Sequence, residues 1–357
     1  MESLGRFPDP FLEEIAGQPA ALRRAGAAVA DQLSVLERLA GERGKPVAFT
    51  GMGSSYHACY PAVTTLASAG ASATMVDAAE LLHFRRPALG PDALLVAVSQ
   101  SGRSAEVVRL VEAVLEPERR PVVAAVTNGV DNPVAGGADL VIETRAGDEL
   151  GPSTMSFAAA LVALSAVARV LGGETPARAM EGVAADVEAC AAVAERLLAF
   201  PVDEAMRLSE WLAGRASLVV LGRGGARAAA EMGALTLKEA ARFPAESLES
   251  AQFRHGPLEL AGPDLAAVVI ATEVETRPLD LGLAADLSRA GAAVLVVTDG
   301  TVEPEPQVEV IATGPLHRLL SPAVAVIPLQ LLAWRLAVER GRRPGTFTVA
   351  AKVTTVE

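Results

Sequence analysis

The sequence predicts an α/β protein made of two tandem three-layer units, each with helices on both faces of a parallel sheet. The first observation is a recurring local pattern: an apolar run such as Leu94–Val98 ends in small polar residues and passes into a helical pattern, as buried parallel strands do. The second is an internal repeat that relates three landmarks 171 positions apart, namely Gly51 with Gly222, Val98 with Val269 and Thr127 with Thr298. Three landmarks at one spacing indicate two copies of a βαβαβ unit.

The chain of 357 residues is long enough for two domains. In chain order we expect a lead-in over 1–44, a first α/β unit over 45–172, a connector over 173–214, a second α/β unit over 215–342 and a tail over 343–357. The lead-in is predicted to be helical between Phe11 and Leu39, and the connector to be helical with a break near Pro201. Open parallel sheets bind ligands beyond the carboxyl ends of their strands. Three turns are predicted there: Gly51–Ser55, Ser99–Ser104 and Gly222–Gly225.

The composition restricts the partners. The formal net charge is −12, which argues against sequence-independent binding to nucleic acid or to an anionic membrane surface. Cys59 and Cys190 are too few for a disulfide framework and are predicted to be small core residues, which fits a reducing cytoplasm. The N-terminus lacks the pattern of a signal peptide. The two most apolar runs, Ala158–Val170 and Ala323–Val338, are interrupted by polar residues or proline and are predicted to be buried helices rather than membrane spans.

The turn Ser99–Ser104 is the first candidate binding site. It joins a predicted strand to a predicted helix, where free amides and the helix dipole favour an anion. Its serines add hydroxyl donors, and Gly102 allows a close approach of the backbone. We infer a phosphate ligand. The alternative is an ordinary loop in which the serine hydroxyls cap the helix.

The second copy differs at the corresponding place. There the sequence is Ile270–Glu275, which is acidic where the first copy has serine and arginine. One composite site is therefore expected, with the phosphate held by the first copy and part of the chemistry supplied by the second. Three residues are candidates for that chemistry: Glu239 near the end of a predicted helix, His255 in a turn set by glycine and proline, and Lys352 in the tail. Each also has an ordinary interpretation, as a solvated helix residue, a turn residue and a mobile terminal charge.

Several short motifs together resemble one family. They are Gly53-Ser54-Ser55-Tyr56, Ser99-Gln100-Ser101-Gly102, Gly147-Asp148-Glu149, Leu235-Thr236-Leu237-Lys238-Glu239, His255-Gly256-Pro257-Leu258 and Ala351-Lys352. In order and spacing they are similar to the sugar isomerase (SIS) family, in particular to the isomerase half of glucosamine-6-phosphate synthase and to stand-alone amino-sugar-phosphate deaminases and isomerases. The resemblance runs from about residue 45 to the C-terminus and implies two tandem, flavodoxin-like SIS domains.

The resemblance also implies roles for single residues. The sugar phosphate is assigned to Ser55, Ser99, Gln100, Ser101 and Ser104, and the rest of the pocket to Gly53, Ser54 and Ala351. Glu239 would move a proton between C1 and C2, His255 would open the sugar ring, and Lys352 would lie near the reactive end of the sugar under a tail that closes the site. In such relatives the histidine comes from a neighbouring subunit, so a homodimer is expected.

The chemistry fits these residue types. Imidazole accepts and donates protons near neutral pH, and a carboxylate partly withdrawn from water can remove a weakly acidic C–H proton. A cation stabilises the charge that develops on the intermediate. No metal or redox cofactor is expected, because Gly51–Tyr56 lacks the third glycine of a dinucleotide fingerprint and the four histidines show no ligand spacing.

Two positions depart from the family pattern. Met155 and Thr236 stand where the synthase and several deaminases carry lysine, so we expect a substrate or outcome that differs in detail from the synthase reaction. We also expect no glutaminase domain in this chain. The leading hypothesis is an amino-hexose 6-phosphate deaminase/isomerase that releases ammonia. The alternatives are a plain aldose–ketose isomerase, a deglycase of a sugar-phosphate amine adduct, and a sensor that binds a sugar phosphate without turnover.

Overall fold

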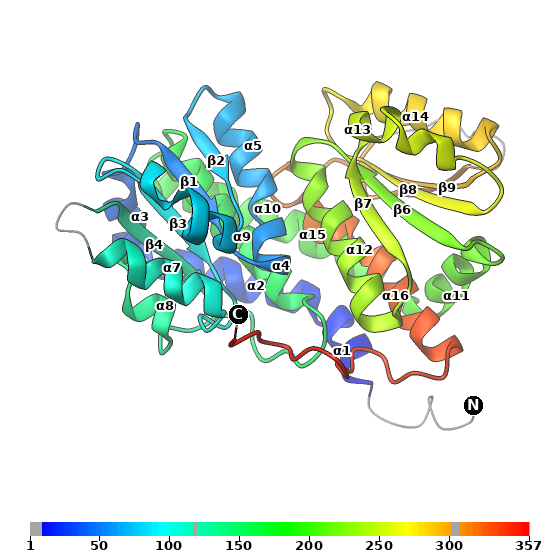
Figure 1. Cartoon of the computed structure of the whole chain (residues 1–357), viewed down its shortest axis with the longest axis horizontal. Helices are drawn as coiled ribbons and strands as arrows, with labels where there is room; N and C mark the ends of the chain where they lie inside the picture. The colour runs from blue at the N-terminus through cyan, green and yellow to red at the C-terminus, as the bar shows by residue number, and fades with distance from the viewer. Residues whose placement is uncertain (1–8, 117–119, 301–307, 357) are drawn as a thin grey trace. The chain divides into compact units, whose positions relative to one another are not determined.

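The computed structural model describes residues 9–116, 120–300 and 308–356. The chain divides into two compact units, each built around one sheet (Figure 1). The sheet-A unit comprises Ala20–Asp148, Met155–Ala189 and Val349–Glu357, and the sheet-B unit comprises Met1–Pro19, Glu149–Thr154 and Cys190–Thr348, both within the described ranges. Each unit is discontinuous in sequence. The boundaries predicted above are continuous segments and stay a prediction.

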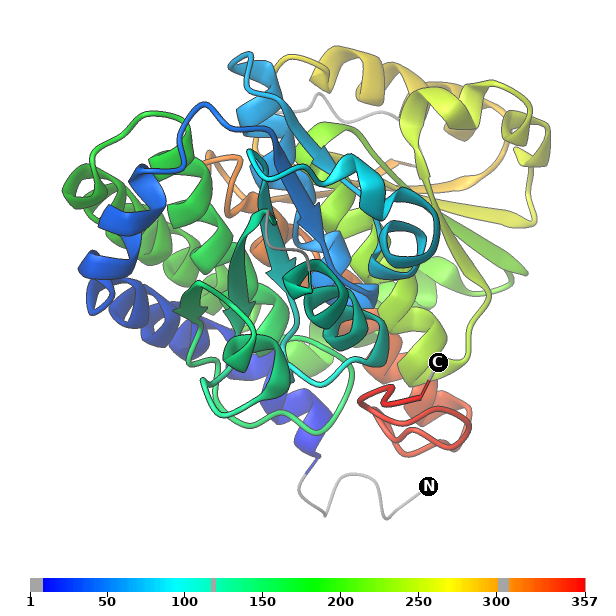
Figure 2. The same cartoon turned by 60° about the vertical axis from the view of Figure 1, so that its left-hand side comes forward.

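Sheet A has five parallel strands in the order β2-β1-β3-β4-β5. They are β1 (Val47–Thr50), β2 (Ala73–Met75), β3 (Leu94–Val98), β4 (Val122–Thr127) and β5 (Leu140–Glu143). Its helical segments are α2 (Gln18–Ala30), α3 (Leu33–Ala40), α4 (Gly53–His57), α5 (Tyr60–Ser68), α6 (Ala78–Glu80), η1 (Leu81–Arg85), η2 (Arg86–Ala88), α7 (Ala105–Leu115), α8 (Pro133–Gly136) and α9 (Met155–Leu171). Figure 2 shows these helices around the sheet.

Sheet B repeats this plan with the order β10-β9-β8-β6-β7. Its strands are β6 (Ser217–Gly222), β7 (Ala245–Glu249), β8 (Leu265–Ala271), β9 (Ala293–Thr298) and β10 (Val308–Ala312). Its helical segments are α1 (Pro10–Ala16), α11 (Pro201–Leu212), η3 (Gly224–Ala226), α12 (Arg227–Ala241), α13 (Ser250–Arg254), η4 (Pro257–Leu260), α14 (Arg277–Arg289), α15 (Ser321–Ala325) and α16 (Ile327–Glu339), and α10 (Pro176–Leu197) joins the two units. The predicted fold class, with two α/β copies, is confirmed.

The cores follow from the strand sequences. All residues of β3 and of β8 are buried, which explains why these strands are apolar throughout rather than alternating. Leu95 and Ala97 of β3 pack with Val107 and Val111 of α7, and the side chains between them point to the other face of the sheet. The sequence pattern thus selects a sheet that is covered on both sides.

Strand pairing corrects one detail of the predicted repeat. Val98 pairs with Val126, whereas Val297, which lies 171 positions after Val126, pairs with Ile270. The counterpart of Val98 is therefore Ile270, and the prediction of Val269 was wrong by one residue. Helices α7 and α14 begin at Ala105 and Arg277, also 172 positions apart, so Ser99–Ser104 corresponds to Ala271–Thr276. From the start of the helix to the start of the next strand the second copy is one residue shorter, with 16 positions from Arg277 to Ala293 against 17 from Ala105 to Val122, which restores the spacing of 171.

One helical stretch in the described part of the chain, Ser321–Glu339, is long and apolar enough to cross a membrane, but 89% of its apolar window is buried within the protein. It packs against α12 and α11. This burial agrees with the predicted core helix at Ala323–Val338, and Ala158–Val170 is likewise buried in α9 except for Arg169. Cys59 and Cys190 are buried and form no disulfide, as predicted, and burial raises the pKa of the Cys59 thiol.

Helix α12, which carries Glu239, is fixed by a close approach to α16. A Cβ atom at Gly233 would lie 2.1 Å from Cδ1 and 3.1 Å from Cβ of Leu329. The helix ends where Arg242 adopts a left-handed conformation, and the Phe243 amide donates to the Leu237 carbonyl, as in common glycine-type C-caps. The position of α12 therefore depends on a glycine at its contact point.

We expect Gly233→Ala to lower the free energy of unfolding by about 1–3 kcal/mol, because the added methyl group overpacks the contact with Leu329. Gly282→Ala in α14 is the matched control, since a methyl group added there would have no other atom within 4 Å and alanine is the better helix former by about 1 kcal/mol. Urea unfolding of both variants checks the opposite signs. Equal stabilisation by the two substitutions would contradict the close approach of α12 and α16.

Candidate active site

The predicted phosphate loop, Ser99–Ser104, is a strand-to-helix turn in the structure. Gly102 has φ of 61°, and a Cβ atom there would lie 1.8 Å from Oδ1 of Asn132. Glycine is therefore required at this position. The loop is held by its backbone, because the Gly102 amide donates to the Ser99 carbonyl (3.1 Å) and the Val134 amide donates to the Gly102 carbonyl (3.2 Å).

The serine side chains of this loop do not act as helix caps. Ser104 is the N-cap residue of α7, yet within the described structure its side chain accepts no capping hydrogen bond. Its Oγ lies 3.4 Å from Oγ of Ser99 instead. Ser101 Oγ accepts from the Arg103 amide (3.2 Å). The capping alternative considered from the sequence therefore does not explain Ser104, and the hydroxyls of Ser99 and Ser104 are gathered at one place.

The glycine turn after β1 lies beside this loop. Because β1 and β3 are paired, with Thr50 opposite Ala97, their carboxyl ends meet at one edge of sheet A. A Cβ atom at Gly51 would lie only 2.8 Å from the Val98 carbonyl oxygen. Ser55 follows in α4, where its amide donates to the Met52 carbonyl (3.2 Å). The segments predicted to hold the phosphate, Gly53–Ser55 and Ser99–Ser104, are thus neighbours.

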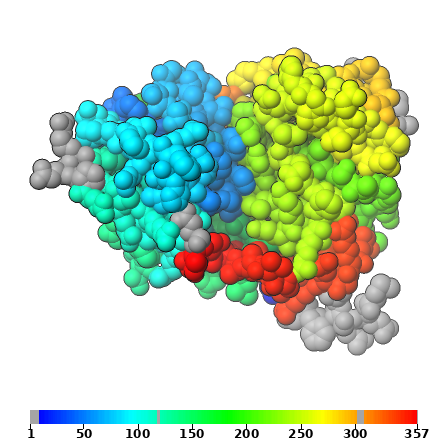
Figure 3. All heavy atoms as spheres, viewed as in Figure 1, coloured from blue at the N-terminus to red at the C-terminus, as the bar shows by residue number. Residues whose placement is uncertain are grey.

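The C-terminal tail reaches the same edge. The Thr354 carbonyl accepts a hydrogen bond from the Ala105 amide (3.0 Å). Ala105 is the first residue of α7 and directly follows the loop. Lys352 is half-buried and Ala351 is exposed. The end of the tail from Val349 onward belongs to the sheet-A unit, and its atoms are red in Figure 3. Sequence reasoning did not foresee this contact, because a backbone carbonyl leaves no signature in the sequence.

The other two candidate catalytic residues belong to the sheet-B unit. Glu239 is half-buried in the last turn of α12. His255 is exposed and follows the short helix α13, with Gly256 at φ of 119° just after it. The structure brings together the residues assigned to the phosphate, with Ala351 and Lys352, in one unit, and it places Glu239 and His255 in the other.

A buried charge network supports the segment that carries His255. Glu249 caps α13 by accepting from the Gln252 amide (2.9 Å). Arg223, in the glycine turn after β6, lies 3.3 Å from Glu249 and 2.9 Å from Asp280. Burial raises the pKa of Asp280, and the hydrogen bond and charge of Arg223 oppose that shift. The sequence singled out Arg223 only as part of a glycine turn and gave no signal for Asp280.

Met155 and Thr236, the two positions where the resemblance led us to expect lysine, are both buried. Thr236 donates its hydroxyl to the Met232 carbonyl (2.9 Å) and is fully inside the helix packing. Met155 lies with its sulfur 3.9 Å from Nη2 of Arg24, and the same nitrogen donates to the Ala146 carbonyl (2.6 Å). A guanidinium group therefore lies beside Met155. Within the described residues there is no cluster of histidine, cysteine and acidic side chains that could hold a metal ion.

Comparison with known families settles the classification. The model of the SIS domain matches residues 43–169 and 212–340. The chain belongs to the SIS domain family. Both SIS domains coincide with the two sheets, and the resemblance stated from the motifs is confirmed.

The chain is similar over its whole length to curated proteins that are longer than it is. It is 31% identical over 365 residues to glutamine–fructose-6-phosphate aminotransferase (isomerizing) of Pyrobaculum aerophilum, a match that covers 100% of this chain and 59% of the relative. It is 31% identical over 372 residues to the protein of the same name from Pseudomonas aeruginosa, covering 99% and 60%. The chain thus spans about three fifths of the length of these relatives.

Solved structures share the fold. The C-terminal domain of glucosamine-fructose-6-phosphate aminotransferase from Francisella tularensis has a TM-score of 0.84 at 24% identity, covering 95% of this chain and 98% of that one. Tagatose-6-phosphate ketose/aldose isomerase from Escherichia coli has a TM-score of 0.78 at 22% identity, covering 95% of each. Glucosamine-6-phosphate deaminase from Thermotoga maritima has a TM-score of 0.73 at 20% identity, covering 96% and 99%.

We expect the double variant Ser101→Ala, Ser104→Ala to bind inorganic phosphate about tenfold more weakly or worse, because each hydroxyl bond to a charged group contributes about 1.5–3 kcal/mol. Titration calorimetry measures this affinity. Ser68→Ala with Ser72→Ala is the control, since both of these serines are exposed elsewhere on the sheet-A unit. An unchanged affinity in the first variant would mean that the anion binds elsewhere.

Proposed function

We propose that this chain is an enzyme that isomerises a sugar phosphate, and specifically that it converts an amino-hexose 6-phosphate to a ketose 6-phosphate and ammonia. The observation that carries the proposal is the carboxyl edge of sheet A, where Gly51–Ser55, Ser99–Ser104 and the tail lie together. Membership in the SIS domain family supports the sugar-phosphate class. The relatives named as aminotransferases and the neighbour named as a deaminase support an amino-sugar substrate.

In this proposal the phosphate is held locally rather than by overall charge. The protein carries a net charge of −12, so a dianion must be bound by directed donors. The amides of a strand-to-helix turn, the start of the eleven-residue helix α7 and the clustered hydroxyls of Ser99 and Ser104 are such donors. Gln100 and Ser55 complete the proposed phosphate site, and Gly53, Ser54 and Ala351 complete the pocket around it.

The proposed reaction moves one proton along the sugar. His255 first opens the ring by moving a proton between the ring oxygen and the C1 hydroxyl. Glu239 then removes the C2 proton from the open-chain aldehyde while the C1 oxygen takes up a proton, which gives an enolamine. Glu239 returns a proton to C1 as the amino group loses one. The product is a ketose with an imine at C2. Water adds to that imine carbon and ammonia leaves, so the ketose phosphate is formed without oxidation or reduction.

The half-buried state of Glu239 and Lys352 suits these roles. A carboxylate partly removed from water is a stronger base toward a C–H bond, and an ammonium group stabilises the oxyanion of the intermediate. His255 is exposed on its unit, as a residue that serves a neighbouring subunit must be. The homodimer and a cytoplasmic location are part of the proposal, as is the tail over 343–357 as a cover for the site.

A plain aldose–ketose isomerase is the second candidate, and the similarity in fold to tagatose-6-phosphate isomerase favours it. The same residues would act, and no ammonia would be released. A deglycase would use them on an amine adduct of the sugar phosphate. A sensor requires the phosphate loop but not Glu239, His255 and Lys352, so the presence of all three favours an enzyme.

A substrate panel tests the proposal. We expect glucosamine 6-phosphate, or an epimer of it, to yield ketose 6-phosphate and ammonia in equal amounts, whereas the unphosphorylated sugar should not react. Coupled assays for the ketose and for ammonia measure both products. Ketose formation from hexose 6-phosphates without ammonia from any amino sugar would favour the plain isomerase. Ligand-induced stabilisation without turnover of any compound would favour the sensor.

We expect Glu239→Gln to lower kcat by about 10²–10⁴-fold with little change in KM, because the amide cannot accept the C2 proton. Exchange of that proton with deuterated water, followed by NMR, should be lost in parallel. Glu246→Gln is the matched control, because Glu246 is a nearby exposed acid paired with Lys238. Retention of full exchange by Glu239→Gln would remove this residue from the mechanism.

A further inference from the structure

The glycine turn of sheet B already holds an anion, and that anion is part of the protein. The Gly225 amide donates to a carboxylate oxygen of Glu273 at 2.9 Å. Glu273 is only 5% exposed. An acid is rarely buried to this extent unless it is paired or hydrogen-bonded, and Glu273 is. Burial raises the pKa of Glu273, while the charge of Arg318 and the backbone donor oppose that shift. The carboxylate is therefore stabilised by protein donors in place of water.

The place that this carboxylate occupies corresponds to the phosphate loop of the first copy. The two glycine turns share one backbone conformation, since Gly53 has φ of 52° and Gly224 has φ of 50°. The strand register makes Glu273 the counterpart of Ser101. An acidic side chain thus reaches the glycine turn in the second copy from the position where the first copy presents a serine hydroxyl.

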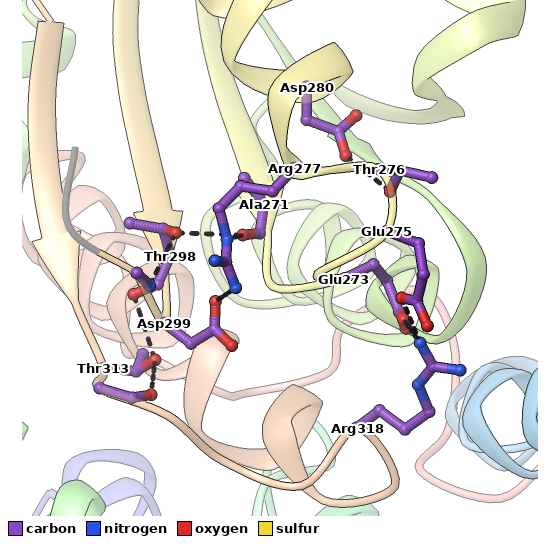
Figure 4. Close-up of polar contacts among 12 residues, drawn as sticks. Ala271, Glu273, Glu275, Thr276, Arg277, Asp280, Thr298, Asp299, Thr313 and Arg318 are labelled. Atoms are coloured by element: carbon purple, nitrogen blue, oxygen red, sulfur yellow. Dashed lines mark hydrogen bonds and ion pairs between the residues drawn. The ribbon is translucent and has the colours of Figure 1, made fainter. Parts of the chain in front are cut away.

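A cation completes this arrangement. Nη2 of Arg318, in the segment between β10 and α15, lies 2.8 Å from Glu273 and 2.5 Å from Glu275. Figure 4 shows both acids turned toward this guanidinium group. Beside Glu273, the buried Thr272 hydroxyl has no hydrogen-bond partner among the described residues. A turn amide and a guanidinium group are donors of the kind that hold phosphate.

We infer that the glycine turn of sheet B is a second anion-binding site that the protein fills with its own Glu273, so that each chain keeps one phosphate site. The site would take a phosphate group once the carboxylate is removed, with Gly225 and Arg318 as its donors. The inference concerns a place that the proposed function does not use. It shares with that function only the idea that these turns bind anions.

The experiment uses the full chain with Ser101→Ala and Ser104→Ala, so that the first loop contributes little. Glu273→Ser is added to this background. The Tm of that variant should be about 2–4 °C higher in saturating inorganic phosphate than in chloride at matched ionic strength. Adding Glu275→Ser is the matched control. It removes an equal charge from the same arginine but leaves Glu273 on the Gly225 amide, so no phosphate-dependent rise is expected. Arg318→Gln combined with Glu273→Ser should lose the rise.

The outcomes separate this inference from the proposed function. A folded Glu273→Ser variant whose Tm does not respond to phosphate, or a Glu275→Ser variant that responds equally, would overturn the inference. If Glu273→Ser unfolds the protein, phosphate but not chloride should restore the fold, and failure to restore it would also overturn the inference. Should the unmodified chain bind no phosphate, the proposed function fails, yet Glu273→Ser should still gain the response.

Discussion

The contact between Gly51 and the carbonyl of Val98 is the constraint on which the candidate site depends. No side chain fits there, because a Cβ atom would lie 2.8 Å from that oxygen. The turn after β1 can therefore lie directly against the end of β3, beside the turn that follows that strand. Parallel pairing makes this possible, since it brings the carboxyl ends of neighbouring strands to one edge. The serines add donors to a geometry that the backbone has already set.

Much of the fold could be predicted because its strongest signals are local or repeated. Continuous apolar strands such as β3 and β8 can only be buried on both faces, and the repeat of glycine turns identifies the two copies. The helices between Phe11 and Leu39 and around Pro201 also followed from local pattern. The predicted counterpart of Val98 in β8 was wrong by one residue, because a spacing taken from glycines cannot detect a residue that is gained between β6 and β8 and lost between the start of α14 and β9. Only strand pairing fixes that register.

The candidate site was less predictable, for a physical reason. The hydrogen bond from the Ala105 amide to the Thr354 carbonyl joins backbone groups far apart in sequence, and any residue type at 354 would offer the same acceptor. The ion pair between Arg223 and Asp280 was also not predictable from the sequence, because an arginine and an aspartate 57 positions apart carry no sign that the fold brings them together. The motifs predicted which side chains are candidates for the chemistry, and those roles stay predictions. The packing that determines which charged side chains come into contact could not be predicted from the motifs.

The two buried substitutions bear on how a charged intermediate is stabilised. Thr236 donates its hydroxyl to its own helix, and this neutral side chain supplies no positive charge. Beside Met155, in contrast, the guanidinium of Arg24 is fixed by its bond to the Ala146 carbonyl. A guanidinium group presents a planar set of donors and does not lose its proton, whereas a lysine can titrate when buried. In the proposed reaction this guanidinium group would stabilise negative charge, and the proton transfers would remain with Glu239 and His255, as proposed above.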